Sequence, residues 1–325
     1  MTRPRVLVLR ALGLGDLLTA VPALRGIRRA YPGHHVTLAT PAYLAPLALA
    51  SGAVDEVRAA VGLATLDARS EPEIAVNLHG RGPQSHALLQ ALRPGRLVAF
   101  RSEDAGHRSG PAWYPGEYEV ARWCRMLAAH GIAADPGDLA LPAPPTGRPG
   151  RVVLHPGAAH PRRRWPADRF AAVARALTGA GADVVLTGSA GERPLAEDVA
   201  AEAGLAPDAV VAGRTDVLGL AGLVAAARLV ICGDTGVAHL ATAFGTPSVA
   251  LFGPVSPLEW GPPPGRPGHI ALWRPGGVVA AAGEGPDPAL LALGVDDVLG
   301  AAARFVTAAA GQPVSPVLSS SPRGR

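Results

Sequence analysis

The sequence contains no lysine, so all 30 of its basic residues are arginine. This absence excludes a Walker-type phosphate loop, in which a lysine has to reach the terminal phosphates of a nucleotide. It also excludes catalysis through a Schiff base, because that intermediate forms on a lysine amine. Two broad classes of enzyme chemistry are therefore ruled out before any motif is considered.

Cysteine and charge are also scarce. The two cysteines, Cys124 and Cys232, lie far apart in apolar surroundings, which gives no support to a disulfide framework or a zinc site. We therefore expect a cytoplasmic protein, with the inner face of the cell membrane as an alternative location. Only 17% of the 325 residues are charged while 48% are hydrophobic, a composition typical of a well-buried chain long enough for two domains.

The net charge of +4 is small for this length and favours small anionic ligands. One short arginine run lacks the broad basic face that nucleic acids need, so we expect no nucleic-acid partner. Apolar stretches of membrane-spanning length are interrupted by proline, glycine and histidine. The sequence therefore predicts a soluble monomer, with peripheral membrane association as an open alternative.

Short apolar segments alternate with segments of helical periodicity, which indicates parallel sheets covered by helices. The predicted strands are 6–9, 36–39, 74–78, 97–100, 152–155, 184–187, 210–212, 229–232 and 248–252. A polar and aromatic stretch, 101–118, interrupts the first series and is expected to form a loop at the mouth of a site. After Gly265 we expect a proline- and glycine-rich loop rather than a further strand.

Prolines and glycines around 141–150 form the clearest break in composition and predict an interdomain linker. We expect two Rossmann-like α/β domains, at 1–140 and 151–285, whose sheets face a central cleft. A C-terminal helix is predicted within 286–312 and could pack back on the first domain. The Ser/Pro-rich residues 313–325 are predicted to be disordered.

The turn after the predicted strand 229–232 carries the strongest chemical signal. Gly233 and Gly236 bracket Asp234 and Thr235, and a helix is expected to begin directly afterwards, with unpaired amide groups that suit a phosphate. Asp234 adds a carboxylate for sugar hydroxyls. His239 adds an imidazole beside the anion, although a core histidine is the alternative. These features together indicate a nucleotide-sugar site.

Asp16 occupies the equivalent turn of the first domain, after Gly13 and Gly15. An aspartate there can cap the following helix. The same position also suits a general base that takes a proton from an acceptor hydroxyl across the cleft. Spacing alone favours the cap and leaves the base as the alternative.

Two further loops of the second domain point to the same ligand. Three consecutive arginines, 162–164, would neutralise the charge on a departing diphosphate, although a solvated basic loop is the alternative. Gly188 and Glu192 follow another strand, where glycine lets a ribose approach the backbone. Glu192 could hold ribose hydroxyls or cap the next helix, and the sequence leaves both open.

Together these motifs resemble glycosyltransferase family 9, the heptosyltransferase family that includes the lipopolysaccharide core heptosyltransferases. The matching motifs are Val6–Arg10 with Leu14-Gly15-Asp16, His155-Pro156-Gly157-Ala158, Arg163 before Trp165-Pro166, Gly188 with Glu192, and Asp234-Thr235-Gly236 followed by His239. The resemblance implies a GT-B fold, with the nucleotide-sugar donor on the second domain and the acceptor on the first. It also implies inversion of configuration by direct displacement.

Carried over by position, the resemblance makes Asp16 the general base and places Arg163, which stands where the family usually has lysine, at the leaving group. It places His155, Gly157, Gly188, Glu192, Asp234, Thr235, Gly236 and His239 in the donor site, with Asp234 at the sugar, Glu192 at the ribose, and Thr235, Gly236 and His239 at the diphosphate. No metal site is expected, and the need for a metal ion stays open.

The function implied is transfer of a heptose or hexose from a nucleoside diphosphate sugar, as co-substrate, to a hydroxyl of a cell-envelope glycan, a glycolipid or a small molecule. No cofactor is expected to be obligatory. The alternatives are a nucleotide-sugar-binding protein without turnover, an epimerase of the same fold and an NAD-dependent oxidoreductase. The last rests only on Gly13-x-Gly15, which lacks the third glycine of the dinucleotide motif.

Overall fold

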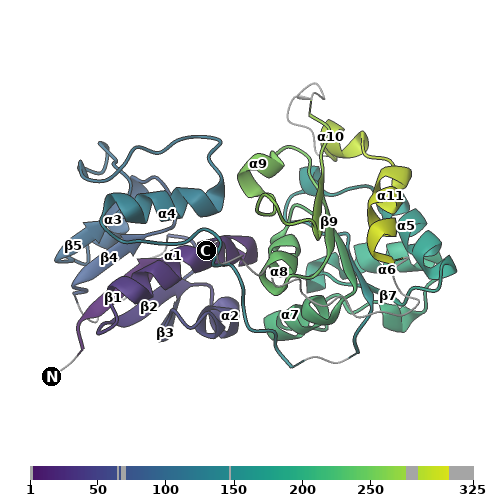
Figure 1. Ribbon diagram of the computed structural model, residues 1–325, viewed down its shortest axis with the longest axis horizontal. Helices are drawn as coiled ribbons and strands as arrows, with labels where there is room; N and C mark the ends of the chain where they lie inside the picture. Colours follow the sequence, from purple (N-terminus) through teal and green to yellow (C-terminus); the bar gives the residue numbers. More distant parts are fainter. Residues whose placement is uncertain (1–2, 64–65, 67–70, 146–147, 276–284, 307–325) are drawn as a thin grey trace, which may run out of the picture.

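A computed structural model of the chain describes residues 3–63, 66, 71–145, 148–275 and 285–306. The predicted tail at 313–325, residues 146–147 of the linker and the end of the predicted C-terminal helix lie outside these residues. Figure 1 shows two lobes side by side, each built around one five-stranded sheet. All strand pairs within the two sheets are parallel, as the sequence predicts.

The first lobe has strand order β3-β2-β1-β4-β5. Its elements are β1 (Arg5–Leu9), α1 (Leu14–Ala30), β2 (His35–Thr40), α2 (Ala45–Ala50), β3 (Glu56–Ala59), β4 (Ile74–Asn77), α3 (Gln84–Gln90), β5 (Arg96–Val98) and α4 (Glu119–Ala129). The central strands are buried along almost their whole length because helices cover both faces of a parallel sheet. The chain changes direction across the sheet at β1 and β4, and ligands of open α/β sheets bind at the carboxyl ends of such strands.

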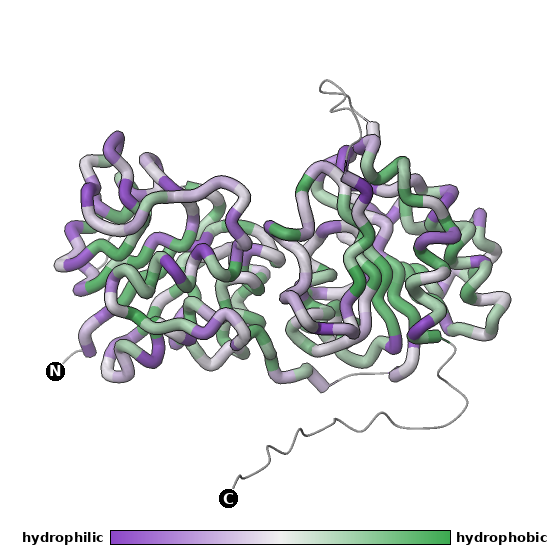
Figure 2. Tube along the Cα trace, turned by 45° about the horizontal axis from the view of Figure 1, so that its top comes forward, coloured by the Kyte–Doolittle hydropathy of each residue, from purple (hydrophilic) through white to green (hydrophobic). Residues whose placement is uncertain are grey.

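The second lobe has strand order β10-β9-β8-β6-β7, with its change of direction at β6 and β8. Its strands are β6 (Val152–His155), β7 (Val184–Leu186), β8 (Leu229–Gly233), β9 (Ser248–Leu251) and β10 (His269–Leu272). Its helices are α5 (Ala167–Gly179), α6 (Arg193–Ala203), α7 (Val217–Ala226), α8 (Gly236–Phe244), α9 (Pro257–Trp260), α10 (Pro288–Leu291) and α11 (Val295–Val306). Figure 2 shows apolar residues running along its strands.

Three expectations about the elements are wrong. The predicted strand 210–212 is reduced to an isolated bridge between Val210 and Leu186. Strands β3 and β10 were not predicted, because β3 is partly exposed and shows no apolar run, and the short apolar run of β10 stands among prolines and glycines. The C-terminal helix does not return to the first lobe, since α11 packs on α5, β9 and β10 of the second.

The two lobes meet where α1 packs against α8, near the centre of Figure 1. One continuous hydrophobic cluster contains residues of both helices, such as Val21 and Leu240. The chain between the lobes also packs on the second lobe, because the amide of Leu141 donates to the carbonyl oxygen of Ala243 at 3.1 Å. Within the residues described above, no helix is both long and apolar enough to cross a bilayer.

Candidate functional site

The turn between β8 and α8 has the geometry that the sequence predicts. β8 ends at Gly233, and α8 begins at Gly236, so that the first amide groups of the helix have no partner within the helix. Thr235 is the N-cap residue, yet its hydroxyl caps nothing and is buried without a hydrogen-bond partner among the described residues. A buried hydroxyl and the amides at a helix start are groups that suit the oxygen atoms of an anion.

Asp234 lies in the same turn and is buried, with 8% of its side chain exposed. Burial raises the pKa of its carboxyl group, and the nearby guanidinium of Arg163 opposes this shift. The Arg163 Nη1 atom lies 3.3 Å from Asp234 Oδ2, while 41% of the Arg163 side chain stays exposed. The structure therefore places a buried carboxylate and a solvent-accessible cation together at the carboxyl end of β8.

The three consecutive arginines do not act as one charged group, which corrects the sequence interpretation. Arg162 pairs with Asp287 at 2.6 Å, and Arg164 donates through Nε to the carbonyl oxygen of Ala158 at 2.9 Å. Both contacts hold the loop in shape. Arg163 alone among the three pairs with the carboxylate at the end of β8.

Glu192 lies beside the ends of β6 and β7 and caps the turn in which it stands. Its Oε2 atom accepts from both the amide and the hydroxyl of Ser189, each at 2.8 Å. Burial raises its pKa, but the two hydrogen bonds from Ser189 and the neighbouring positive charges together outweigh burial and hold the pKa below the usual value. The predicted cap of the next helix is wrong, because the Glu192 side chain makes no capping hydrogen bond to α6 and bonds back to Ser189 instead. The Oε1 atom takes part in neither bond, so contact with a ribose stays a prediction.

Gly157 and Gly188 leave room for the side chain of Glu192, which lies close to both. A Cβ at Gly157 would lie 2.4 Å from the Glu192 carboxyl carbon, and one at Gly188 would lie 3.2 Å from the Glu192 Cβ. His155, at the end of β6, is hydrogen-bonded through Nδ1 to the hydroxyl of Thr187 at 3.0 Å. Burial lowers the His155 pKa, so the ring is neutral and supports the strand ends.

Asp16 lies in the first turn of α1 and combines two contacts with partial exposure. Its Oδ2 atom accepts from the amide of Gly13 at 3.2 Å, so Asp16 caps α1 from its third position, whereas the sequence favoured Asp16 itself as the N-cap residue, which is Gly13. Its Oδ1 atom lies 3.2 Å from Nη2 of Arg10, and 27% of the side chain is exposed. The carboxylate of Asp16 thus caps the helix and still reaches solvent. The two contacts are therefore compatible with a role for Asp16 as a base.

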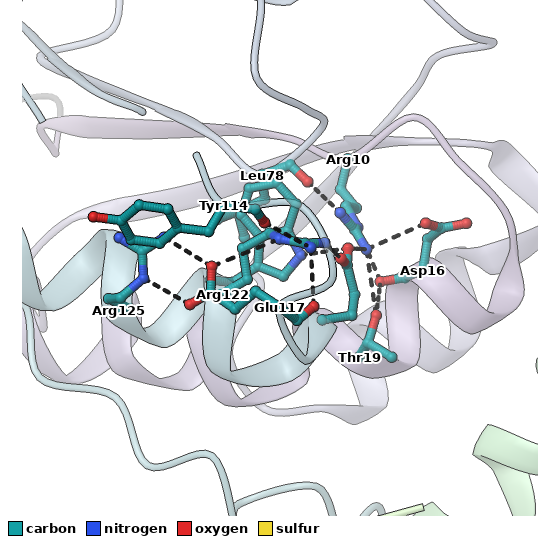
Figure 3. A network of polar contacts seen from close by, with 10 residues as sticks. Arg10, Asp16, Thr19, Leu78, Tyr114, Glu117, Arg122 and Arg125 are labelled. Atoms are coloured by element: carbon teal, nitrogen blue, oxygen red, sulfur yellow. Dashed lines mark hydrogen bonds and ion pairs between the residues drawn. The ribbon is translucent and has the colours of Figure 1, made fainter. Parts of the chain in front are cut away.

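Arg10 is the main site residue that sequence reasoning missed. Its side chain is 1% exposed and donates to the backbone oxygens of Asp16 at 2.9 Å and Leu78 at 2.5 Å, and to Glu119 Oε1 at 2.9 Å. Figure 3 shows the guanidinium reaching from β1 toward these groups. The sequence does contain a sign of this role, since Arg10 comes directly after a buried strand and before a glycine-containing turn. A charge at such a position needs buried partners.

The network continues into the loop that we expected at the mouth of the site. Glu119 Oε1 also accepts from Trp123 Nε1 at 2.7 Å, and its Oε2 pairs with Arg122. Arg122 in turn donates to the backbone oxygen of Glu117 at 2.9 Å, and Arg125 pairs with the Glu117 carboxylate at 2.6 Å. A chain of charges thus connects Asp16 to the 101–118 loop, as Figure 3 shows in part.

His79 is a second residue that the sequence did not single out for chemistry. It follows β4, the strand next to β1, and its Nδ1 atom is buried without a hydrogen-bond partner among the described residues. Burial lowers its pKa and the charge of Arg10 lowers it further, while the carboxylate of Asp16 opposes both. His79 therefore lies within electrostatic range of the proposed base.

The glycines of both turns serve the contact between the lobes. A Cβ at Gly15 would lie 2.9 Å from Cδ2 of His239, and a Cβ at Gly236 would lie 2.8 Å from the side chain of Leu14. Asp16 follows Gly15 directly, and Asp234 precedes Gly236 by two residues. The junction of α1 and α8 therefore brings the two aspartate-bearing turns together.

His239 faces the first lobe. Its ring packs against Gly15, lies edge-on to Trp260 with centroids 6.1 Å apart, and lines a small cavity with Leu18 and Tyr118. Burial lowers its pKa to about 4, so the ring is neutral at neutral pH. In this arrangement His239 serves the contact between the lobes, and its predicted place at the diphosphate stays a prediction.

This burial predicts a pH-dependent loss of stability. The His239 pKa falls from 6.5 to about 4 on folding, so the stability present above pH 6.5 is lost as pH falls through that interval. We expect the unfolding free energy, measured by urea titration, to fall more steeply from pH 7 to pH 5 in the wild type than in His239→Gln, whose side chain does not titrate. If the unfolding free energy of both proteins depends on pH equally, protonation of His239 does not destabilise the fold.

Comparison with known proteins gives one family and a consistent set of structures. Residues 132–273 match the family model "Glycosyltransferase family 9 (heptosyltransferase)". Lipopolysaccharide heptosyltransferase 2 of Salmonella typhimurium is 35% identical over 106 residues, which are 32% of this chain and 30% of that protein. The chain thus spans less than a third of the length of this curated relative.

Two solved structures resemble nearly the whole chain. The glycosyl transferase family 9 protein of Veillonella parvula has a TM-score of 0.76 at 19% identity, covering 94% of this chain and 98% of that one. ADP-heptose lps heptosyltransferase II of Escherichia coli has a TM-score of 0.73 at 22% identity, covering 93% and 98%. These likenesses confirm the predicted GT-B fold. The family match includes Arg163 and Asp234. It begins at residue 132 and therefore does not include Asp16.

Proposed function

We propose that this chain, whose residues 132–273 match the glycosyltransferase family 9 model, is an inverting glycosyltransferase. It would transfer a heptose or a hexose from a nucleoside diphosphate sugar to an acceptor hydroxyl. The observation that carries the proposal is the junction of α1 and α8, where a partly exposed carboxylate of one lobe and a carboxylate–arginine pair of the other share one boundary.

The second lobe supplies groups suited to the donor. The amides at the start of α8, the Thr235 hydroxyl and the Arg163 guanidinium would bind the diphosphate. Asp234 would accept hydrogen bonds from hydroxyls of the transferred sugar. Glu192 would use Oε1 for the ribose, since Oε2 is occupied by Ser189.

The first lobe supplies the base. Asp16 would take the proton of the acceptor hydroxyl as the acceptor oxygen forms a bond to the anomeric carbon of the donor sugar. The bond between that carbon and the diphosphate oxygen breaks in the same step, and the leaving diphosphate carries the electron pair away. Arg163 and the α8 amides would stabilise its charge. Attack from the face opposite the leaving group accounts for inversion.

The relatives suggest the substrates. The E. coli structure is named for ADP-heptose, and the Salmonella relative is named for lipopolysaccharide. We propose an ADP-heptose-like donor, a cell-envelope glycan or glycolipid as the preferred acceptor, and a cytoplasmic location at or near the inner face of the membrane. No metal is required in the proposed step, because Arg163 and the α8 amides supply the positive charge.

The experiment that tests the function combines binding and turnover. Purified protein is screened by thermal shift against ADP, UDP and GDP and their sugar conjugates, and candidate acceptors are then added while nucleoside diphosphate release is measured. We expect a rise in Tm with at least one nucleoside diphosphate and release that depends on the acceptor. Stabilisation without release would indicate a binding protein, whereas a response to NADH alone would indicate an oxidoreductase.

Arg163→Ala should slow leaving-group departure. Loss of one group that stabilises developing negative charge typically costs about 10²–10³ in kcat, and we expect an effect of that size. The matched control is Arg193→Ala on α6, which removes an arginine whose partner is the exposed Glu197. The measurement is kcat with saturating donor. Equal kcat values for the two variants would remove Arg163 from the reaction.

A further inference from the structure

We propose that Asp234 and the diphosphate compete for Arg163, so that the site discriminates the nucleoside diphosphate sugar from the bare nucleoside diphosphate product. This inference rests on the proposed function and adds a second role for Asp234, as the internal competitor of the phosphates. The observation behind it is the direct ion pair between Arg163 Nη1 and Asp234 Oδ2, at 3.3 Å.

The two partners differ in freedom to move. The Asp234 side chain is 8% exposed, and the residue is fixed by its amide, which donates to the backbone oxygen of Leu251 at 3.0 Å. The Arg163 side chain is 41% exposed, on the short helical turn Pro161–Arg163. An approaching anion can therefore draw the guanidinium outward, whereas the carboxylate has to stay where it is.

A buried carboxylate that loses its cation carries a penalty. Removing one partner of a buried ion pair is destabilising, and sharing the partner with another anion carries part of that penalty. The neighbouring arginines cannot replace Arg163, because Arg162 is held by Asp287 and Arg164 by the backbone of Ala158. Asp234 therefore needs other hydrogen-bond donors whenever a diphosphate engages Arg163.

The intact donor brings these donors with it, since its sugar hydroxyls would lie at Asp234. The bare diphosphate has none. Once the sugar has moved to the acceptor, Asp234 is again without partners and draws Arg163 back, which weakens the hold on the diphosphate. The same pair would thus favour the donor before the transfer and favour release of the product after it.

The test uses Asp234→Asn, which removes the negative charge and keeps the shape of the side chain. Dissociation constants are measured by calorimetry for the full-length protein with ADP, UDP or GDP, whichever binds the wild type most tightly. We expect Asp234→Asn to bind this diphosphate about tenfold more tightly than the wild type, a size within the range of coupling between contacting charges. Its sugar conjugate should gain less, because Asn still faces the hydroxyls but no longer accepts at both oxygens.

Two comparisons make the result specific. Asp183→Asn changes the net charge equally, just before β7 at the amino end of the same sheet, and should alter affinity less than about twofold. In an Arg163→Gln background, neutralising Asp234 should change affinity less than about threefold, because the contested cation is absent. Any of three results overturns the inference: no tightening in Asp234→Asn, equal tightening in Asp183→Asn, or an undiminished effect in the Arg163→Gln background.

The inference and the proposed function fail in different ways. If the wild type binds a nucleoside diphosphate but Asp234→Asn binds it no better, only the competition is wrong. If neither protein binds any of the three diphosphates, the donor site itself is wrong and the proposed function falls with it.

Discussion

Asp16→Asn should lower kcat by about 10²–10⁴, the usual contribution of a positioned general base. An asparagine at this position can still accept from the Gly13 amide, as Oδ2 of Asp16 does at 3.2 Å, so the start of α1 should keep its geometry. The donor contacts proposed for the second lobe are untouched. We therefore expect the donor dissociation constant to stay within about twofold while turnover falls, the pattern of a lost transition-state interaction.

Asp138→Asn provides a matched control in the same lobe. The Asp138 side chain is 29% exposed, close to the 27% of Asp16, and it too is paired with arginine, at 2.6 Å from Arg25. This carboxylate pairs with Arg25 in the second half of α1, whereas Asp16 lies in the first turn of that helix, and its neutralisation should leave kcat unchanged. Turnover of Asp16→Asn at the wild-type level would exclude Asp16 as the base, whatever the control does.

Arg10→Met should cost about 3–5 kcal/mol of unfolding free energy, the typical loss when one partner of a buried ion pair is removed. The reason is that Arg10, 1% exposed, lies between the carboxylates of Asp16 and Glu119 and also satisfies the backbone oxygen of Leu78. Arg122 still pairs with Glu119 in the variant, which keeps the loss within this range. Urea unfolding followed by far-UV circular dichroism measures it.

Arg93→Met is the control, because Arg93 pairs with Glu71 on the surface of the same lobe with 82% of its side chain exposed. Exposed pairs contribute about 0–1 kcal/mol, and we expect a change of that order. If too little Arg10→Met is folded without ligand for a complete curve, the wild type and the variant are both unfolded with the same concentration of nucleoside diphosphate. Their urea midpoints are then compared. Similar losses for the two variants would show that the buried network contributes no more than a surface pair.

The parts of the fold that the sequence predicts are those carried by local patterns. Buried central strands such as β1 and β8 are continuous apolar runs, and each ends in a glycine-containing turn that can be read directly. The phosphate-compatible start of α8 follows from the same turn. The edge strand β3 shows no such run, because its partial burial permits polar residues, and the run of β10 is short and flanked by prolines and glycines.

The parts that the sequence could not give depend on pairs far apart in the chain. Arg10 and Glu119 are joined by a buried ion pair across 109 positions, and no local pattern connects them. Gly15 looks like part of a phosphate-binding motif, yet in the structure it makes room for His239 of the other lobe. Likewise, only the coordinates show that Arg163 faces Asp234 while Arg162 faces Asp287.

A crystal structure of the full-length protein with the nucleoside diphosphate sugar that it binds most tightly tests the proposed mechanism most directly. We expect the diphosphate within hydrogen-bond distance of the α8 amides and Arg163, and the sugar between Asp234 and Asp16 with its anomeric carbon open toward Asp16. A donor bound elsewhere, or a sugar turned away from the first lobe so that Asp16 faces no reacting atom, would contradict it.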